Sequence, residues 1–119
     1  MRFSIISAST FLLAAVNAAS IVAKDANIVA NWSLKTYTDG ACTTGRTQDG
    51  GNTPKGCTNL ATPANSYKYS SSYDPNSGVQ YSLIQYAGLN CVRQVGQDDG
   101  NAGNACSART FESYKVVAN

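Results

Sequence analysis

The sequence predicts an all-β domain built from two copies of one unit. Short runs of aromatic and aliphatic residues alternate with clusters of Gly, Asn, Asp, Pro and Ser, which is typical of strands joined by turns. Beyond the N-terminal segment, no stretch carries the apolar stripe of an amphipathic helix. The third observation is an internal repeat, which becomes visible when the chain is shifted by 49 residues against itself.

The first 18 residues have the pattern of a secretory signal peptide. Arg2 supplies the positive charge, residues 3–16 form a mostly apolar run, and Val16-Asn17-Ala18 provides a cleavage site. Serines interrupt the run, which is shorter than the ~18 apolar residues that a membrane span needs. We therefore expect a secreted, extracellular domain over residues 19–119 with no membrane span.

The composition excludes several function classes. The chain has 119 residues, a formal net charge of +2, 13% charged residues and no histidine. That length suits one domain, and the near-neutral charge gives no reason to expect a nucleic-acid partner, which would need a clustered basic face. Without histidine, the commonest general base and metal ligand is missing. We expect no cofactor, no metal site and no enzymatic activity.

The two copies share residue types as well as spacing. Between residues 32–57 and 81–106, nine of 26 aligned positions are identical without a gap. After a two-residue gap, Ser66-Tyr67-Lys68 aligns with Ser113-Tyr114-Lys115. Repeat one therefore covers about 30–73 and repeat two about 79–117, with the turn-rich segment 74–78 between them.

Strands are expected at the two ends of each copy. The runs are Asn31–Thr38 and Tyr67–Tyr73 in repeat one, and Val79–Tyr86 and Phe111–Val117 in repeat two. One such unit is too small to bury its own apolar face, so the two copies should pack face to face. The tyrosines at 67, 69 and 73 alternate, which indicates either core packing or an exposed aromatic surface for a partner.

Two polar segments occupy matching places in the copies. They are Gln48–Asn52 and Gln97–Asn101, both rich in Asp and Gly. Because Asp-Gly favours type I′ geometry, we expect two hairpin turns. The alternative is a calcium or partner site, since carboxylate and carbonyl oxygens suit calcium.

A short sequence motif lies at the start of each copy. In repeat two it is Tyr81, four residues, Tyr86, one residue and Gly88. In repeat one Trp32 and Tyr37 hold the aromatic positions. The pattern resembles the Greek-key signature of the βγ-crystallins, and the resemblance covers nearly the whole mature chain. It implies that the two copies are tandem Greek keys in one disulfide-stabilised β-sandwich, with Tyr37 and Tyr86 packed in the core.

The same resemblance assigns further residues. In repeat one Asp39 stands in the glycine position, or Gly40 takes this role with a shift of one residue. At that position a positive φ is expected, which Gly88 adopts without strain and which Asp39 tolerates better than most residues. Ser66 and Ser113 match the serine that lies under the folded hairpin. The residues before them do not match the calcium-binding pattern of the family, so no intact calcium site is implied.

Four cysteines, Cys42, Cys57, Cys91 and Cys106, lack the close pairs of a zinc site. In a secreted chain they predict two disulfides. Three pairings are open, and the duplication favours Cys42–Cys57 with Cys91–Cys106. Each bridge would close a loop of about 16 residues and contribute roughly 3 kcal/mol.

The predicted function is that of a secreted, non-enzymatic binding or toxin-like protein. Small secreted microbial proteins similar to this family look like killer-toxin-type antimicrobials, and a host-interacting effector is equally in keeping with the signal. The alternatives are a proteinase inhibitor, whose loops would be Thr43–Gly56 and Val92–Ala105, and a structural or carbohydrate-binding wall protein. The partner is an unidentified extracellular protein or glycan, and the chain is expected to be a monomer. Asn31-Trp32-Ser33 is a candidate N-glycosylation site, although the bulky Trp32 should lower its use.

Overall fold

The structure, a computed structural model, describes residues 29–119 and confirms the all-β class. The predicted signal peptide lies outside the described residues. Residues 29–74 and 78–119 form one compact unit, to which Pro75–Ser77 does not belong. The elements are β1 (Asn31–Tyr37), β2 (Thr47–Gly51), β3 (Lys55–Ser72), β4 (Tyr81–Tyr86), the short 3-10 turn η1 (Leu89–Cys91), β5 (Gln94–Asp98) and β6 (Ser107–Ala118).

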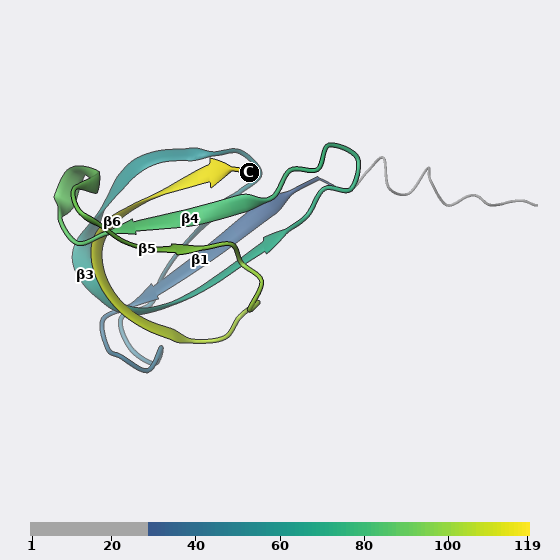
Figure 1. Cartoon of the computed structure of the whole chain (residues 1–119). Coiled ribbons are helices and arrows are strands. Elements are labelled where there is room, and N and C mark those ends of the chain that lie inside the picture. The colour runs from purple at the N-terminus through teal and green to yellow at the C-terminus, as the bar shows by residue number, and fades with distance from the viewer. Residues whose placement is uncertain (1–28) are drawn as a thin grey trace, which may run out of the picture. The chain divides into compact units, whose positions relative to one another are not determined.

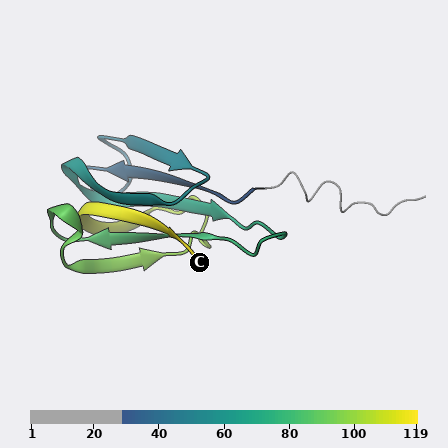
Figure 2. The ribbon, with the colours of Figure 1, turned by 90° about the horizontal axis from the view of Figure 1, so that it is seen from above.

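The six strands form one antiparallel sheet in the order β2-β1-β3-β6-β4-β5. The sheet is folded into two layers, as a β-sandwich is (Figures 1 and 2). Seen from above, the blue strands of repeat one form one layer, and the green and yellow strands of repeat two form the other (Figure 2). The long strands β3 and β6 join the layers.

Each long strand belongs to both layers because its two halves have different partners. β3 begins with Lys55 opposite Val116 of β6, and its second half runs beside β1. β6 begins with Ser107 opposite Tyr67 of β3, and its second half runs beside β4. Irregularities in the register between Asn59 and Ser66 mark the crossing of β3. Each repeat therefore lends half a strand to the layer of the other repeat.

This exchange explains why the predicted disulfide pairing is wrong. The bridges are Cys42–Cys106 and Cys57–Cys91, with Cα–Cα distances of 6.0 and 5.9 Å. The first half of β3 carries Cys57 to the layer of repeat two, where Cys91 lies. The approach to β6 brings Cys106 to Cys42 in the same way. Both bridges therefore join one repeat to the other, and the two bridges are equivalent under the 49-residue shift.

The predicted strands are found, with three additions and one correction. β1 and β4 match the aromatic runs, whereas β2, β5 and the first half of β3 were not predicted. The turn predicted at Gln48–Asn52 is wrong, because Asp49 and Gly50 lie within β2. In repeat two, β5 extends to Asp98, and Gly100 adopts a φ of 82° in the loop that follows. The turn-rich character of the 74–78 segment is reproduced, with Gly78 N donating to the Asp74 carbonyl at 2.8 Å.

The core between the layers is dominated by aromatic side chains. Tyr67 and Phe111 meet edge to face with ring centroids 5.8 Å apart, a favourable arrangement for aromatic pairs. Tyr69 is buried as well, and its hydroxyl donates to the Tyr81 carbonyl at 2.8 Å. Tyr73, by contrast, is 55% exposed. The exposed aromatic surface considered for this run is therefore wrong for Tyr67 and Tyr69, which pack in the core.

Within residues 29–119, no helix has the length and apolar character needed to cross a membrane.

Candidate ligand-binding groove

The two signature serines occupy equivalent buried positions. Ser66 Oγ donates to the Asp39 carbonyl at 2.6 Å and accepts from Cys42 N at 2.9 Å. Ser113 Oγ makes the same pair of bonds with the Gly88 carbonyl and Cys91 N, at the same distances. Both serines are fully buried. Each hydroxyl thus fastens the segment that follows β1 or β4 onto the sheet.

The backbone of these segments differs from the expectation at the glycine position. Gly88 has an extended conformation with φ −108°, and neither Asp39 nor Gly40 has a positive φ. The left-handed region is occupied at Cys42 in repeat one, with φ 58°, and at Asn90, Cys91 and Arg93 in repeat two, with φ 60°, 57° and 63°. The predicted positive φ at the glycine position is therefore wrong. What the two copies share is a left-handed cysteine three residues after the glycine position, where the serine hydroxyl and the disulfide hold the backbone.

Asp39 closes the first of these segments through its side chain. Its carboxylate accepts from Thr43 N at 3.0 Å and Thr44 N at 3.1 Å, and also from the Thr43 hydroxyl. The hydrogen bond from the Thr43 hydroxyl is the main reason why the pKa of Asp39 lies far below its usual range. The side chain therefore remains ionised and acts as a structural acceptor.

The four aromatic signature residues, Trp32, Tyr37, Tyr81 and Tyr86, are all buried. Trp32 Nε1 donates to the Thr53 carbonyl at 2.9 Å, and the Tyr81 hydroxyl donates to the Asn52 carbonyl at 2.8 Å. Both bonds hold the turn between β2 and β3. The Lys68 ammonium lies 5.9 Å from the centre of the Tyr37 ring, a cation–π distance.

The carboxylates of the matching polar segments bond to tyrosines from the other repeat. The Tyr114 hydroxyl donates to Asp49 at 2.5 Å, and the Tyr67 hydroxyl donates to Asp98 at 2.9 Å. Lys55 Nζ adds an ion pair to Asp49 at 2.5 Å. Burial raises the pKa of Asp49, but the hydrogen bonds from Lys55, Tyr114 and Gly50 N outweigh it, so that the net pKa is lowered. Among residues 29–119, no cluster of three or more His, Cys, Asp or Glu could hold a metal ion.

A groove lies in the half of the molecule that contains β1 and β2. It consists of two hollows of about 310 and 350 Å³, which share Thr36, Thr47, Leu60 and Ala61. We call it the first-repeat groove. Its lining is Leu34, Thr36, Tyr37, Thr38, Gly45, Arg46, Thr47, Gln48, Asp49, Lys55, Thr58, Asn59, Leu60, Ala61, Thr62, Pro63, Ala64 and Tyr114.

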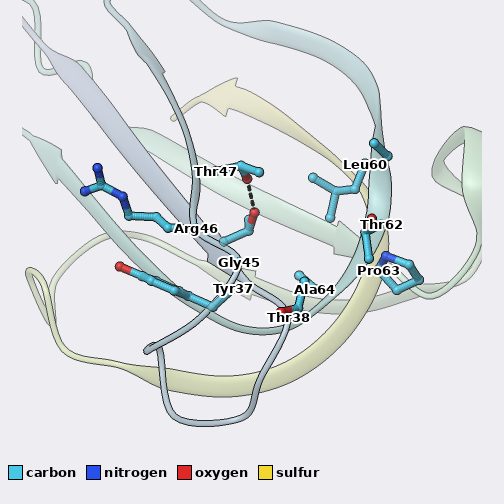
Figure 3. Close-up of a pocket in the computed structure, with 11 residues that line it drawn as sticks. Tyr37, Thr38, Gly45, Arg46, Thr47, Leu60, Thr62, Pro63 and Ala64 are labelled. Carbon is cyan, nitrogen blue, oxygen red and sulfur yellow. Dashed lines mark hydrogen bonds between the residues drawn. The ribbon is translucent and has the colours of Figure 1, made fainter.

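Two elements form the opposite walls of the groove. Figure 3 shows Leu60, Thr62 and Pro63 of β3 facing the strand that carries Thr47. The dashed line in that view joins the hydroxyls of Thr36 and Thr47, which are hydrogen-bonded to each other. Arg46 extends away from Leu60 and Pro63 (Figure 3). The groove therefore has an apolar surface on β3, formed by Leu60 and Pro63, and threonine hydroxyls on β1, β2 and β3.

The equivalent space in repeat two is filled by side chains. The guanidinium of Arg109 lies against β5, with Cζ only 2.6 Å from the position that a Cβ on Gly96 would take. Arg109 also donates to the Val95 carbonyl. Phe111, two residues before Ser113, fills the core beside Tyr67. The residue two before Ser66 is Ala64, which faces Phe111 in the register of β3 and β6.

The groove thus follows from a difference between the copies. Thr47 replaces the glycine over which Arg109 packs, and Ala64 replaces the phenyl ring. Repeat one also has two more residues in the crossing segment of its long strand, which corresponds to the two-residue gap in the repeat alignment. Leu60, which packs partly against the core, occupies some of the freed volume. Sequence reasoning noted that gap but did not identify the groove, and the Ala64–Phe111 difference was the signal available.

Asn31, the candidate glycosylation site, lies at the exposed start of β1, and its backbone N donates to Ser72 Oγ at 3.1 Å. The exposed large apolar side chains include three of repeat two, namely Leu89 of η1, Val95 of β5 and Val92 between these elements.

No protein-family model, no curated protein and no solved structure matches this chain.

Proposed function

We propose that this chain is a secreted, non-enzymatic binding protein of toxin-like or effector type, and that the first-repeat groove contacts its extracellular target. The observation that carries the proposal is the groove itself. The two copies are otherwise arranged alike, but repeat one lacks the side chains that fill this space in repeat two. Leaving such a space costs stability, and a ligand that fills it would offset this cost.

The proposal includes the arrangement of the two copies as Greek keys of βγ-crystallin type. In each copy the first two strands form a hairpin, and the last strand segment returns to lie beside the first, as in a Greek key. The intervening segment pairs in the other layer. The equivalent bonds of Ser66 and Ser113 support the same assignment.

Secretion is supported by the cysteines, since all four are in disulfides. Such bridges persist in oxidising compartments outside the cytosol. The N-terminal signal pattern points to the same destination.

A binding role suits the chemistry of the groove better than catalysis does. The carboxylate in its wall is Asp49, whose lowered pKa keeps it ionised near neutral pH. An ionised carboxylate already bonded to Lys55 and Tyr114 is poorly suited to act as a general acid or base. The threonine hydroxyls have no histidine beside them, because the chain contains none.

The inhibitor alternative receives less support from the strands. It required residues 43–56 and 92–105 to form long protruding loops, but β2 and β5 occupy parts of these segments and pair with β1 and β4. Less of each segment is therefore free to enter the active site of a proteinase.

The test uses the oxidised, secreted chain and two matched variants. Ala61→Trp places a bulky ring at an exposed position that lines both hollows, whereas Ala108→Trp adds the same ring at an exposed position on β6 outside the groove lining. The first assay is capture of a target from yeast walls, plant apoplast and secreted proteins, and the second is growth inhibition. Both activities should be lost in Ala61→Trp and kept in Ala108→Trp. Equal activity of both variants would refute the groove as the contact site.

A further inference from the structure

We infer that the first-repeat groove binds a short, neutral oligosaccharide through its threonine hydroxyls and the apolar wall of β3. This inference rests on the proposed function, because it names the ligand of the same groove. Three observations support it: the size of the groove, its polar groups and the charges at its edge.

The size is that of a small-ligand site. The hollows of about 310 and 350 Å³ lie at the lower end of the ~300–1,000 Å³ range of small-molecule pockets. Because they adjoin through Thr36, Thr47, Leu60 and Ala61, the ligand can extend from one to the other. A linear chain of sugar rings has this elongated form.

The polar groups of the groove match a polyol. Thr36, Thr47 and Thr62 come from three different strands, and Gln48 adds an amide group. A hydroxyl can donate one hydrogen bond and accept two. The Thr36–Thr47 bond therefore leaves this pair with donor and acceptor capacity, which sugar hydroxyls can use in either sense. Leu60 and Pro63 offer an apolar surface to the C–H face of a ring.

The charges favour a neutral ligand over an anionic one. Lys55, the cation of the second hollow, is paired with Asp49 at 2.5 Å. Arg46 extends away from the β3 wall (Figure 3). In repeat two, the equivalent space already holds a cation, the guanidinium of Arg109. A phosphate or sulfate in the first-repeat groove would find no unpaired cation aimed into it from these residues.

The experiment is calorimetric titration of the oxidised chain with four probes. Neutral β-glucan and chitin oligosaccharides are compared with a sulfated oligosaccharide and with an extended peptide of mixed sequence. We expect binding of a neutral oligosaccharide and at least about tenfold weaker binding of the sulfated one, which corresponds to about 1.4 kcal/mol. Ala61→Trp should abolish binding, and Ala108→Trp should not change it.

A second pair of variants tests the hydroxyl chemistry without blocking the groove. Thr47→Val keeps the side-chain shape but removes a hydroxyl that lines both hollows, and it should weaken sugar binding several-fold. Thr53→Val makes the same change at an exposed turn residue outside the lining and should leave affinity unchanged. Circular dichroism and an intact disulfide map establish that each variant is folded.

The outcomes separate the two proposals. If Ala61→Trp abolishes target capture but no neutral oligosaccharide binds, the proposed function stands and the sugar inference fails. Preferred binding of the peptide or of the sulfated probe likewise overturns the sugar inference. If Ala61→Trp leaves target capture unchanged, the groove is not the contact site and the proposed function fails.

Discussion

Ser66 and Ser113 show how much one side chain contributes to this fold. Each hydroxyl bonds a backbone N–H and a backbone carbonyl in the segment that follows the first strand of its repeat. Family resemblance identified both positions from sequence. It did not indicate that Cys42 and Cys91 would both be left-handed, because the strain there depends on contacts with distant strands.

Replacing Ser113 with alanine should destabilise the chain by about 1–3 kcal/mol, because partly buried backbone groups of Cys91 and Gly88 lose their partner. Ser66→Ala should cost about the same, since its bonds have the same lengths. Urea unfolding measures both effects. Ser70→Ala, at a half-buried serine of β3, is the control and should change stability little. If Ser113→Ala left the free energy of unfolding unchanged, this would contradict the role assigned to the hydroxyl.

The buried tyrosines should make stability fall in alkali. Burial is the main cause of the raised pKa of Tyr69, Tyr114 and Tyr67. A raised pKa means that the folded state binds the tyrosine proton more tightly than the unfolded state does. The resulting contribution to the free energy of unfolding is complete below the usual pKa of 10.0 and is lost progressively as pH rises above it. Unfolding free energy should therefore decline above about pH 10. Constant stability there, with all tyrosines titrating in the folded chain, would contradict this expectation.

At the scale of the elements, the sequence predicted the strands that carry core residues. β1 and β4 are short runs rich in aromatic and aliphatic residues, most of which are buried, and such runs are visible in the sequence. β2 has the sequence TQDGG and is largely exposed, so it carries no such signal. Its pairing with β1 depends on the layer that β1 and β3 form. The crossing of β3 was missed for the same reason, because its first half is mostly exposed.

The disulfide pairing is an element-scale prediction that peptide mapping can check directly. Complete tryptic cleavage after Lys35, Arg46, Lys55, Lys68, Arg93 and Arg109 places each cysteine in a different peptide. Without reduction, peptide 36–46 should be linked to 94–109, and 56–68 to 69–93. On the chain-entropy model each bridge contributes about 4 kcal/mol. Linkage of 36–46 to 56–68 would restore the pairing that the repeat alone suggested.

At the scale of the molecule, the two copies exchange strand segments and are not two independent units in tandem. A repeat along the sequence suggested two self-contained units, each with its own bridge. In the structure, both bridges and both tyrosine–aspartate bonds connect one repeat to the other. The groove marks a place where the copies differ, since Ala64 stands where Phe111 does. A sequence comparison of the copies could have located that difference. It could not have located the first-repeat groove, because Leu60 occupies part of the space.

The exchange predicts that neither half folds alone. A fragment of residues 29–77 contains Cys42 and Cys57, whose partners lie in the other half, and the first half of its β3 would lack β6. Its core residues would also lose Phe111 and Tyr114. The fragment should therefore be unfolded, as seen from the fluorescence of Trp32. Mixed with residues 78–119 under oxidising conditions, it should regain native fluorescence and both inter-repeat disulfides. Cooperative unfolding of the first fragment by itself would show that the repeats are independent units, and that strand exchange is not what stabilises the fold.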